Sequence, residues 1–122
     1  MLDKIILAGK FDRFDEYWTP KIIGEMNGQY IKLAKLKGEF VWHSHDNEDE
    51  YFQVIKGSIT IHLRAQTVVL EEGESFIVPK GVEHKPEALE EAHVMMIVPK
   101  DAHHTGGTKT LLTVETENQE WL

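Results

Sequence analysis

The residues of this chain most able to do chemistry begin with a pair of histidines. His43 and His45 are two positions apart, and Glu50 follows five positions later. Side chains at positions i and i+2 of a strand point to the same face, so both imidazoles can face one point. His84 follows a Pro-Lys-Gly turn at residues 79–81 that would return the chain toward the pair. Imidazole and carboxylate are common ligands of divalent metals, so the pattern predicts a metal site.

Two neighbouring acidic residues compete for the carboxylate position. Glu50 and Asp49 point in opposite directions if the strand is regular. We favour Glu50, which shares its face with Phe52 and Val54. We expect Glu48 and the preceding Asp46 to be solvated charges at the rim.

The other histidines give weaker signals. His93 lies in an apolar strand, where it either lines the cavity as a general base or packs as an ordinary histidine. His62 should face away from the core. His103 and His104 precede a Gly-Gly loop, where a rim position and a catalytic role both fit.

Short strands separated by turns must position these residues. Asn-Gly at 27–28 is a hairpin signal, and Glu-Glu at 90–91 reads as a polar turn. Many short strands and almost no helix indicate an all-β sandwich or barrel, formed by one domain over residues 1–122 with its core at 20–115. The strands that we expect cover residues 20–26, 29–36, 40–45, 51–55, 58–63, 67–70, 75–78, 84–86, 92–98 and 108–115.

The amino-terminal residues should lie outside this barrel. Phe11, Phe14 and Trp18 have helical spacing, which favours one or two helical turns within residues 10–18 that cap one barrel face. Residues 1–8 are rich in Leu and Ile, and they offer an edge strand, for example to a partner. This segment is too short and too charged for a secretion signal.

The composition excludes several kinds of partner and site. Thirteen basic and 21 acidic residues give a net charge of −8, which argues against nucleic acid and anionic membranes as partners. No apolar run is long enough to span a membrane. The chain has no cysteine, so disulfides and thiolate metal sites are excluded, and a reducing compartment such as the cytoplasm is expected.

With these elements in place, the chain resembles the cupin family. The first cupin motif is matched by Gly38, His43, His45, Glu50 and Gly57, and the second by Gly73, Pro79, Gly81 and His84. Two positions depart from the pattern: Gly38 is one residue closer to His43 than usual, and Ala88 stands where the second motif usually ends in Asn.

The resemblance implies a double-stranded β-helix, the cupin jelly-roll barrel, with a short N-terminal helical segment. It also implies a three-His-one-carboxylate site from His43, His45, His84 and Glu50, in which Glu50 is a ligand and a possible catalytic base. Such a set suits Fe, Mn, Ni, Zn, Co or Cu and leaves coordination positions open. The chain looks like the small bacterial cupins labelled mannose-6-phosphate-isomerase-like, and a homodimer is implied.

Two functions fit this site. The first is a metal-dependent enzyme acting on a small oxygenated substrate in the barrel, with dioxygenase chemistry ahead of isomerase. The alternative is a non-catalytic cupin that binds or senses a sugar or an acid. Phosphosugar chemistry ranks lower, because only Lys32 and Arg64 fall near the expected mouth, and Arg64 points outward. Because protonated imidazole cannot bind metal, we expect metal loss below about pH 6.

Overall fold

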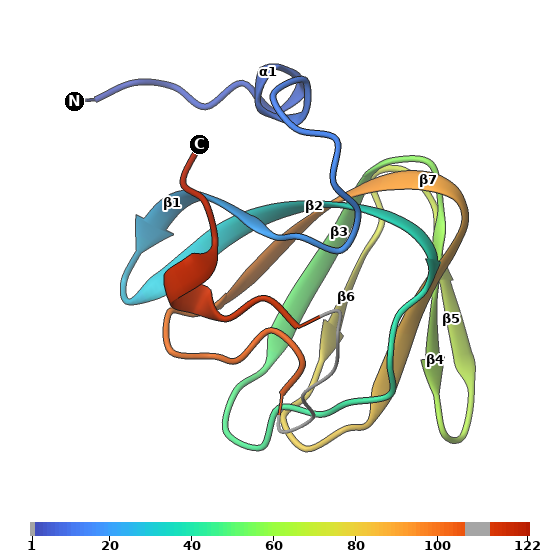
Figure 1. The fold of residues 1–122 in the computed structure, drawn as a ribbon. Helices are drawn as coiled ribbons and strands as arrows, with labels where there is room; N and C mark the ends of the chain where they lie inside the picture. The colour runs from blue at the N-terminus through green and yellow to red at the C-terminus, as the bar shows by residue number, and fades with distance from the viewer. Residues whose placement is uncertain (1, 107–112) are drawn as a thin grey trace.

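The computed structural model describes residues 2–106 and 113–122. It is an all-β jelly roll in which every strand pairing is antiparallel, as predicted. Figure 1 shows the curled sheet with one short helix beyond it. The elements are α1 (Leu7–Phe11), β1 (Lys21–Met26), β2 (Gln29–Glu39), β3 (Glu50–Lys56), β4 (Ile59–Leu63), β5 (Thr67–Leu70), β6 (Ser75–Val78), β7 (His84–Pro99) and the 3-10 turn η1 (Thr116–Asn118).

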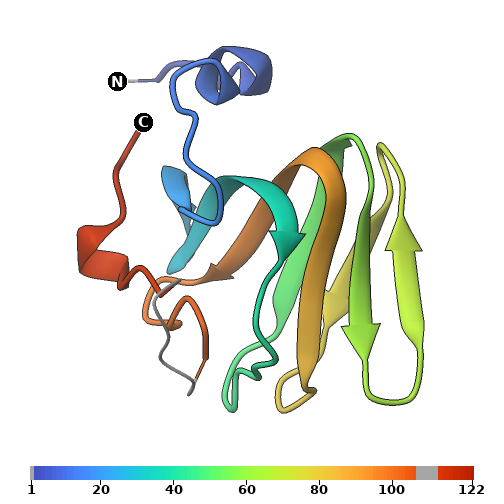
Figure 2. The ribbon, with the colours of Figure 1, turned by 45° about the vertical axis from the view of Figure 1, so that its right-hand side comes forward.

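Strand β7 joins the two halves of the barrel. Its first residues pair with β4 and its last residues with β3, while β2 follows it along the other side. Figure 2 shows β7 arching from one half to the other. The predicted turn at residues 90–91 is therefore wrong. The strand continues through these residues as a bulge, because Leu36 pairs with Ala92 whereas Gly38 pairs with Ala88. A bulge exposes its side chains as a turn does, so both favour the same polar residues.

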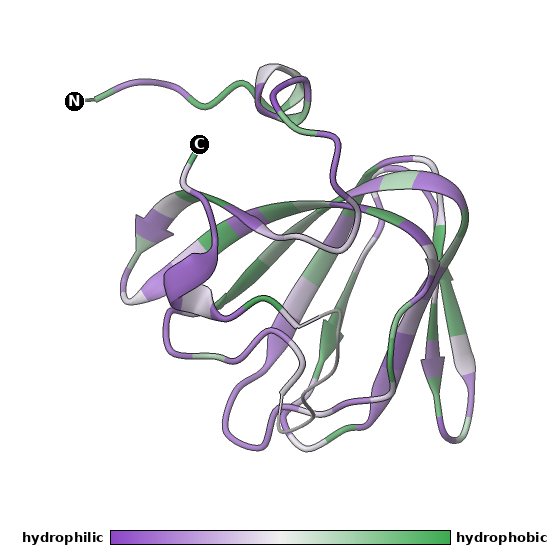
Figure 3. Ribbon diagram, viewed as in Figure 1, coloured by the Kyte–Doolittle hydropathy of each residue, from purple (hydrophilic) through white to green (hydrophobic). Residues whose placement is uncertain are grey.

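The barrel interior is apolar and follows the two-residue period of the strands. Buried residues alternate with partly exposed ones through most of β3 and β7. Figure 3 shows hydrophobic and hydrophilic bands side by side along the strands. Ala88, at the position where the motif usually has Asn, is 1% exposed and lies in this core. It packs as an apolar residue there. The central residues of the cluster are Phe52, Val54, Ile59, Ile61, Val78, Ala92, Val94 and Met96.

A second layer covers the outer face of β2. Phe11 and Phe14 pack with Ile23 and Leu33 in a separate apolar cluster. The helix begins earlier than predicted, at Leu7, and ends at Phe11. The expected edge strand does not form over residues 2–8, where the helix starts instead.

Three further segments differ from expectation. Residues 40–45 contribute an isolated bridge at His43 rather than a continuous strand. The strand expected at 108–115 falls largely outside the described residues, and 113–115 are not in a strand. From residues 117–122 the sequence predicts only a tail, but this segment is tied to the sheet, because Trp121 bridges to Ile22 of β1. No helix in the described part of the chain is long and apolar enough to cross a membrane.

Candidate metal centre

Backbone contacts across the barrel position the three predicted histidine ligands, His43, His45 and His84. His43 and His84 face each other in an antiparallel bridge. The amide of Gly81 donates to the carbonyl of His45 at 2.8 Å, so the turn before His84 is tied to the histidine pair. The positive φ of 80° at Gly81 favours glycine there. These contacts bring three histidines from two distant segments to one place.

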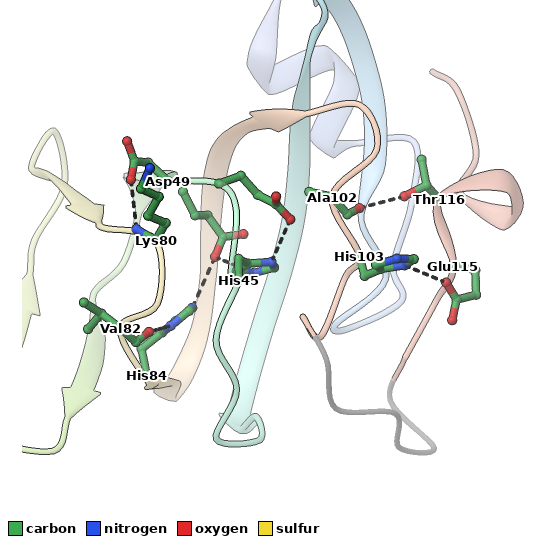
Figure 4. Close-up of polar contacts among 11 residues, drawn as sticks. His45, Asp49, Lys80, Val82, His84, Ala102, His103, Glu115 and Thr116 are labelled. Carbon is green, nitrogen blue, oxygen red and sulfur yellow. Dashed lines mark hydrogen bonds and ion pairs between the residues drawn. The ribbon is translucent and has the colours of Figure 1, made fainter.

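The structure brings all four predicted ligands together. His43, His45, Glu50 and His84 are buried, and one donor atom from each lies within 4.8 Å of all the others. The carboxylate of Glu50 contacts two of the imidazoles, those of His45 and His84, which are labelled in Figure 4. Its Oε1 lies 3.3 Å from Nε2 of His84 and 3.5 Å from Nε2 of His45.

Backbone carbonyls orient two of the imidazoles. Nδ1 of His43 lies 2.9 Å from the carbonyl oxygen of Val41, and Nδ1 of His84 lies 3.0 Å from that of Val82. A carbonyl only accepts hydrogen bonds, so each Nδ1 carries the proton and each Nε2 keeps its lone pair. Outer contacts of this kind are typical of metal-binding histidines.

The third imidazole provides the test of whether a metal fits. His45 is 4% exposed, and neither ring nitrogen has a hydrogen-bond partner among the described residues. The nearest carboxylates are at 3.5 Å (Glu50) and 3.9 Å (Glu48). Burial of an unpaired polar nitrogen is costly. A metal ion bound to one of the two His45 nitrogens would remove the cost of burying that nitrogen unpaired. The donor set therefore fits a divalent transition metal.

The electrostatics keep Glu50 anionic beside the imidazoles. Burial acts to raise the pKa of Glu50, but His45 and His84 outweigh it and hold that pKa far below the usual range. Burial, followed by the charge of His84, lowers the pKa of His43 to about 4. Burial also acts to lower the pKa of His45, but the Glu50 carboxylate outweighs it and raises that pKa above its usual value.

The competing carboxylate points elsewhere. Oδ1 of Asp49 accepts a hydrogen bond from the backbone amide of Lys80 at 2.8 Å (Figure 4). Asp49 therefore stabilises the turn before His84 and is not in the cluster. Glu48, expected at the rim, has a side chain that is only 17% exposed and leans toward His45.

Three of the four remaining histidines lie outside the cluster on the surface or rim, and the fourth lines a cavity. His93 stacks on Phe11 at 4.6 Å and its Nε2 lies 2.8 Å from Glu91, on the outer face, so it does not line the cavity. His62 contacts Glu87 at 2.8 Å. His103 is an exposed rim residue whose Nδ1 lies 3.5 Å from the carboxylate of Glu115 (Figure 4).

His104 is a cavity residue that the sequence left undecided. Its Nδ1 accepts a hydrogen bond from the amide of Val114 at 2.9 Å, and its ring packs on Phe40 at 5.1 Å. Burial lowers the pKa of His104 to about 4, so the ring is neutral near pH 7. The contact depends on residues 113–116 folding back over the barrel, for which the local sequence holds no signal.

Two small cavities adjoin the cluster. One of about 30 Å³ borders His43 and Glu50, and one of about 20 Å³ borders His45 and Glu50. Each has room for about one or two water molecules. The sequence offers Tyr30, Trp42, Phe52, Phe76 and Met96 as candidate cavity walls. Phe52 and Met96 line the first cavity, whereas Tyr30, Trp42 and Phe76 line neither. The remaining walls of the first cavity are Trp18, Pro20, Ala34, Leu36, Phe40, Pro86 and His104.

Comparison with known proteins defines the class. A family model described as "Cupin domain" matches residues 30–99, more than half of the chain. The chain therefore belongs to the cupin family.

Individual relatives agree with this assignment. A cupin-2 domain protein of Shewanella frigidimarina is 47% identical, with a TM-score of 0.77 over 78% of this chain and 93% of that one. Protein NMB1881 of Neisseria meningitidis is 28% identical, with a TM-score of 0.74 over 80% and 99%. Uncharacterized protein YdbB of Bacillus subtilis is 38% identical over 52% of this chain and 57% of its own length. The chain spans about half the length of the curated relatives that it matches.

Proposed function

We propose that this cupin is a metal-dependent enzyme that acts on a small oxygenated substrate, with dioxygenase chemistry ahead of isomerase chemistry. The observation that carries the proposal is the buried imidazole of His45, which has no hydrogen-bond partner among the described residues and lies beside the Glu50 carboxylate. His43, His45, His84 and Glu50 would hold one ion of Fe, Mn, Ni, Zn, Co or Cu. Bound there, the metal would act as a Lewis acid with open positions for substrate oxygens.

The chain's own residues have separable roles in this proposal. Val41 and Val82 fix the tautomers of two ligands through their carbonyl oxygens. The low pKa of Glu50 favours its role as an ionised ligand. Its second proposed role, as a proton acceptor, requires release of the carboxylate from the neighbouring imidazoles. The apolar walls of the barrel exclude bulk water from the reacting atoms.

The first experiment is elemental analysis of protein purified without an affinity tag or chelator. About one equivalent of iron, manganese or nickel is expected. Oxygen uptake is then measured with a panel of catechols, 2-hydroxy acids and 2-oxo acids. His45→Ala should abolish turnover while the circular dichroism spectrum is retained. Turnover that is unchanged in this variant would refute the proposal.

The small, mostly apolar cavity favours a second candidate, a non-catalytic module that binds or senses a sugar or an acid. A space of about 30 Å³ admits only one small group of a ligand, which suits recognition of that group more than exchange of substrate and product. A rise of the melting temperature with a ligand that is never turned over would favour this candidate. Turnover of any panel compound would exclude it.

We also propose that the single domain of residues 1–122 forms a homodimer in the cytoplasm. Leu2 is fully exposed and Ile6 is 58% exposed, so the amino-terminal segment offers apolar surface to a second copy. Light scattering should show a dimer that is weakened by Leu2→Ser with Ile6→Ser. Leu89→Ser, at an equally exposed site on β7, is the matched control and should leave the dimer intact. A monomeric wild-type protein would contradict the proposal.

A further inference from the structure

Three lysines are buried in the part of the chain that the structure describes, and they differ in their partners. Lys21 is 3% exposed and forms ion pairs of 3.0 Å with Glu16 and Glu120. Lys35 is 8% exposed and donates a hydrogen bond to the carbonyl of Phe14. Lys32 is 4% exposed, and no hydrogen bond or ion pair to it exists among residues 2–106 and 113–122. Its ammonium has a distant ring contact with its neighbour on β2, Tyr30, at 5.9 Å.

Lys32 lies inside the barrel beside the candidate metal centre. It is on the same face of β2 as Ala34, which lines the first cavity, and it lines the second cavity with His45, Glu50 and His104. Lys32 interacts electrostatically with the same three groups. Its charge lowers the pKa of His45 and His104, and the Glu50 carboxylate raises the pKa of Lys32 against the larger effect of burial.

Lys32 is 4% exposed, so its ammonium is largely removed from bulk water, and such a charge is costly unless an anion joins it. The Glu50 carboxylate is in contact with His45 and His84, and no ion pair joins it to Lys32. A further donor lines the same cavity. The amide of Val114 donates to Nδ1 of His104, so the neutral ring carries its proton on Nε2. Lys32 and His104 thus place a cation and a neutral donor beside the space that adjoins the metal centre.

We propose that Lys32 anchors a carboxylate group of the substrate, so that this cupin acts on a small carboxylic acid. The proposal rests on the proposed function, because the other end of the acid would lie at the metal centre. A carboxylate fits better than a phosphate, because a single cation balances its single charge and the cavity is small. Lys32 is the specificity-determining residue in this arrangement, and His104 supports it.

The experiment compares glycolate with glycolamide, its neutral isostere, on zinc-loaded protein by titration calorimetry. The measured quantity is the ratio of the glycolamide Kd to the glycolate Kd. It should fall at least tenfold in Lys32→Met and in Lys32→Gln, because the charge is lost in both. Lys35→Met is the matched control, a buried lysine on the other face of the same strand, and its ratio should stay within twofold of wild type. Circular dichroism and zinc content verify that each variant is folded and loaded.

The outcomes separate this inference from the proposed function. A ratio that is unchanged in both Lys32 variants overturns the carboxylate anchor, even if zinc binds. Inorganic phosphate is the second probe. If Lys32→Met loses more affinity for phosphate than for glycolate, the carboxylate anchor is also overturned. If the wild-type protein binds no metal, the proposed function fails. The titration on zinc-free protein then tests the carboxylate anchor independently of the metal. The anchor is supported if glycolate binding still requires Lys32, and it is overturned if glycolate binding does not.

Discussion

The backbones of His43 and His84 hydrogen-bond to each other in both directions. The amide of His43 donates to the carbonyl of His84 at 3.0 Å, and the amide of His84 donates to the carbonyl of His43 at 2.9 Å. The two imidazole centroids are 4.2 Å apart as a result. Because the backbone makes this link, truncation of either side chain should remove a donor nitrogen and leave the strands in place.

We therefore expect His43→Ala and His84→Ala to lose metal without unfolding. Loss of contacts that merely orient a ligand costs about 10- to 100-fold in metal affinity, so loss of a ligand should cost at least about 100-fold. Elemental analysis and circular dichroism measure the two effects. His62→Ala is the control, since His62 pairs with Glu87 on the outside of the barrel. About one equivalent of metal in either cluster variant would contradict the assignment.

Metal binding should release a proton from His45. Glu50 raises the pKa of His45, so the metal-free protein holds a proton there up to a higher pH than an ordinary imidazole would. This charge pair stabilises the fold fully below the unfolded-state pKa, and the stabilisation is lost as the pH rises through the raised pKa. His43, with a pKa of about 4, has no proton to release at pH 7. Titration calorimetry in buffers of different ionisation enthalpy should show release of up to about one proton at pH 7, decreasing as the pH rises.

The control for this release is Glu50→Gln, which removes the carboxylate that raises the pKa of His45. Any residual metal binding by that variant should release fewer protons than metal binding by the wild-type protein. Heats that are independent of the buffer at pH 7 would contradict the expected role of His45. Competition with protons, chiefly at His45, also sets the acid limit, and metal loss is expected below about pH 6.

Lys32→Met should stabilise the metal-free protein at neutral pH. Burial lowers the pKa of Lys32 from 10.5 to about 8. Between pH 8 and pH 10.5 the Lys32 side chain holds its proton more tightly in the unfolded chain than in the folded protein. The contribution of Lys32 to wild-type stability is therefore lowest below pH 8 and rises toward pH 10.5. The variant lacks this penalty. Its free energy of unfolding in urea should exceed that of wild type by up to about 3 kcal/mol at pH 7, and the difference should shrink toward pH 10.5.

A matched substitution should change the free energy of unfolding in the opposite direction. Lys35→Met should destabilise the protein, because it leaves the Phe14 carbonyl without its buried donor. If Lys32→Met proved less stable than wild type at pH 7, an anionic partner for Lys32 within the fold would be required. This measurement is independent of any ligand.

The sequence was sufficient to predict which residues meet at the centre. The i, i+2 spacing of His43 and His45 and the strand alternation that separates Glu50 from Asp49 depend on local geometry alone. The turn before His84 is also local. The β7 bulge was not predictable in this way, because an exposed Glu-Glu pair satisfies a turn and a bulge equally well.

The cavity walls depend on contacts between distant segments. His104 faces the cavity because its ring nitrogen accepts the amide of Val114. Lys32 could be placed on the inner face of its strand by alternation, but its lack of a partner emerges only when every neighbour is in place. Long-range contacts of this kind have no periodic signature in the sequence.

Gly106 holds the loop of His104 against the metal-binding segment, and its substitution should open the site. Its φ is 59°, and an added Cβ would overlap the carbonyl oxygen of Ser44, which lies between His43 and His45 in the sequence. Gly106→Ala should therefore force the loop away and break the hydrogen bond between His104 and Val114. Gly28→Ala is the control, because its φ of +77° carries a similar conformational cost of about 1–2 kcal/mol with no neighbour within 4 Å. Hydrogen exchange of the Val114 amide should accelerate in Gly106→Ala and stay at the wild-type rate in Gly28→Ala. Equal exchange in the two variants would mean that this contact does not hold His104 in the cavity.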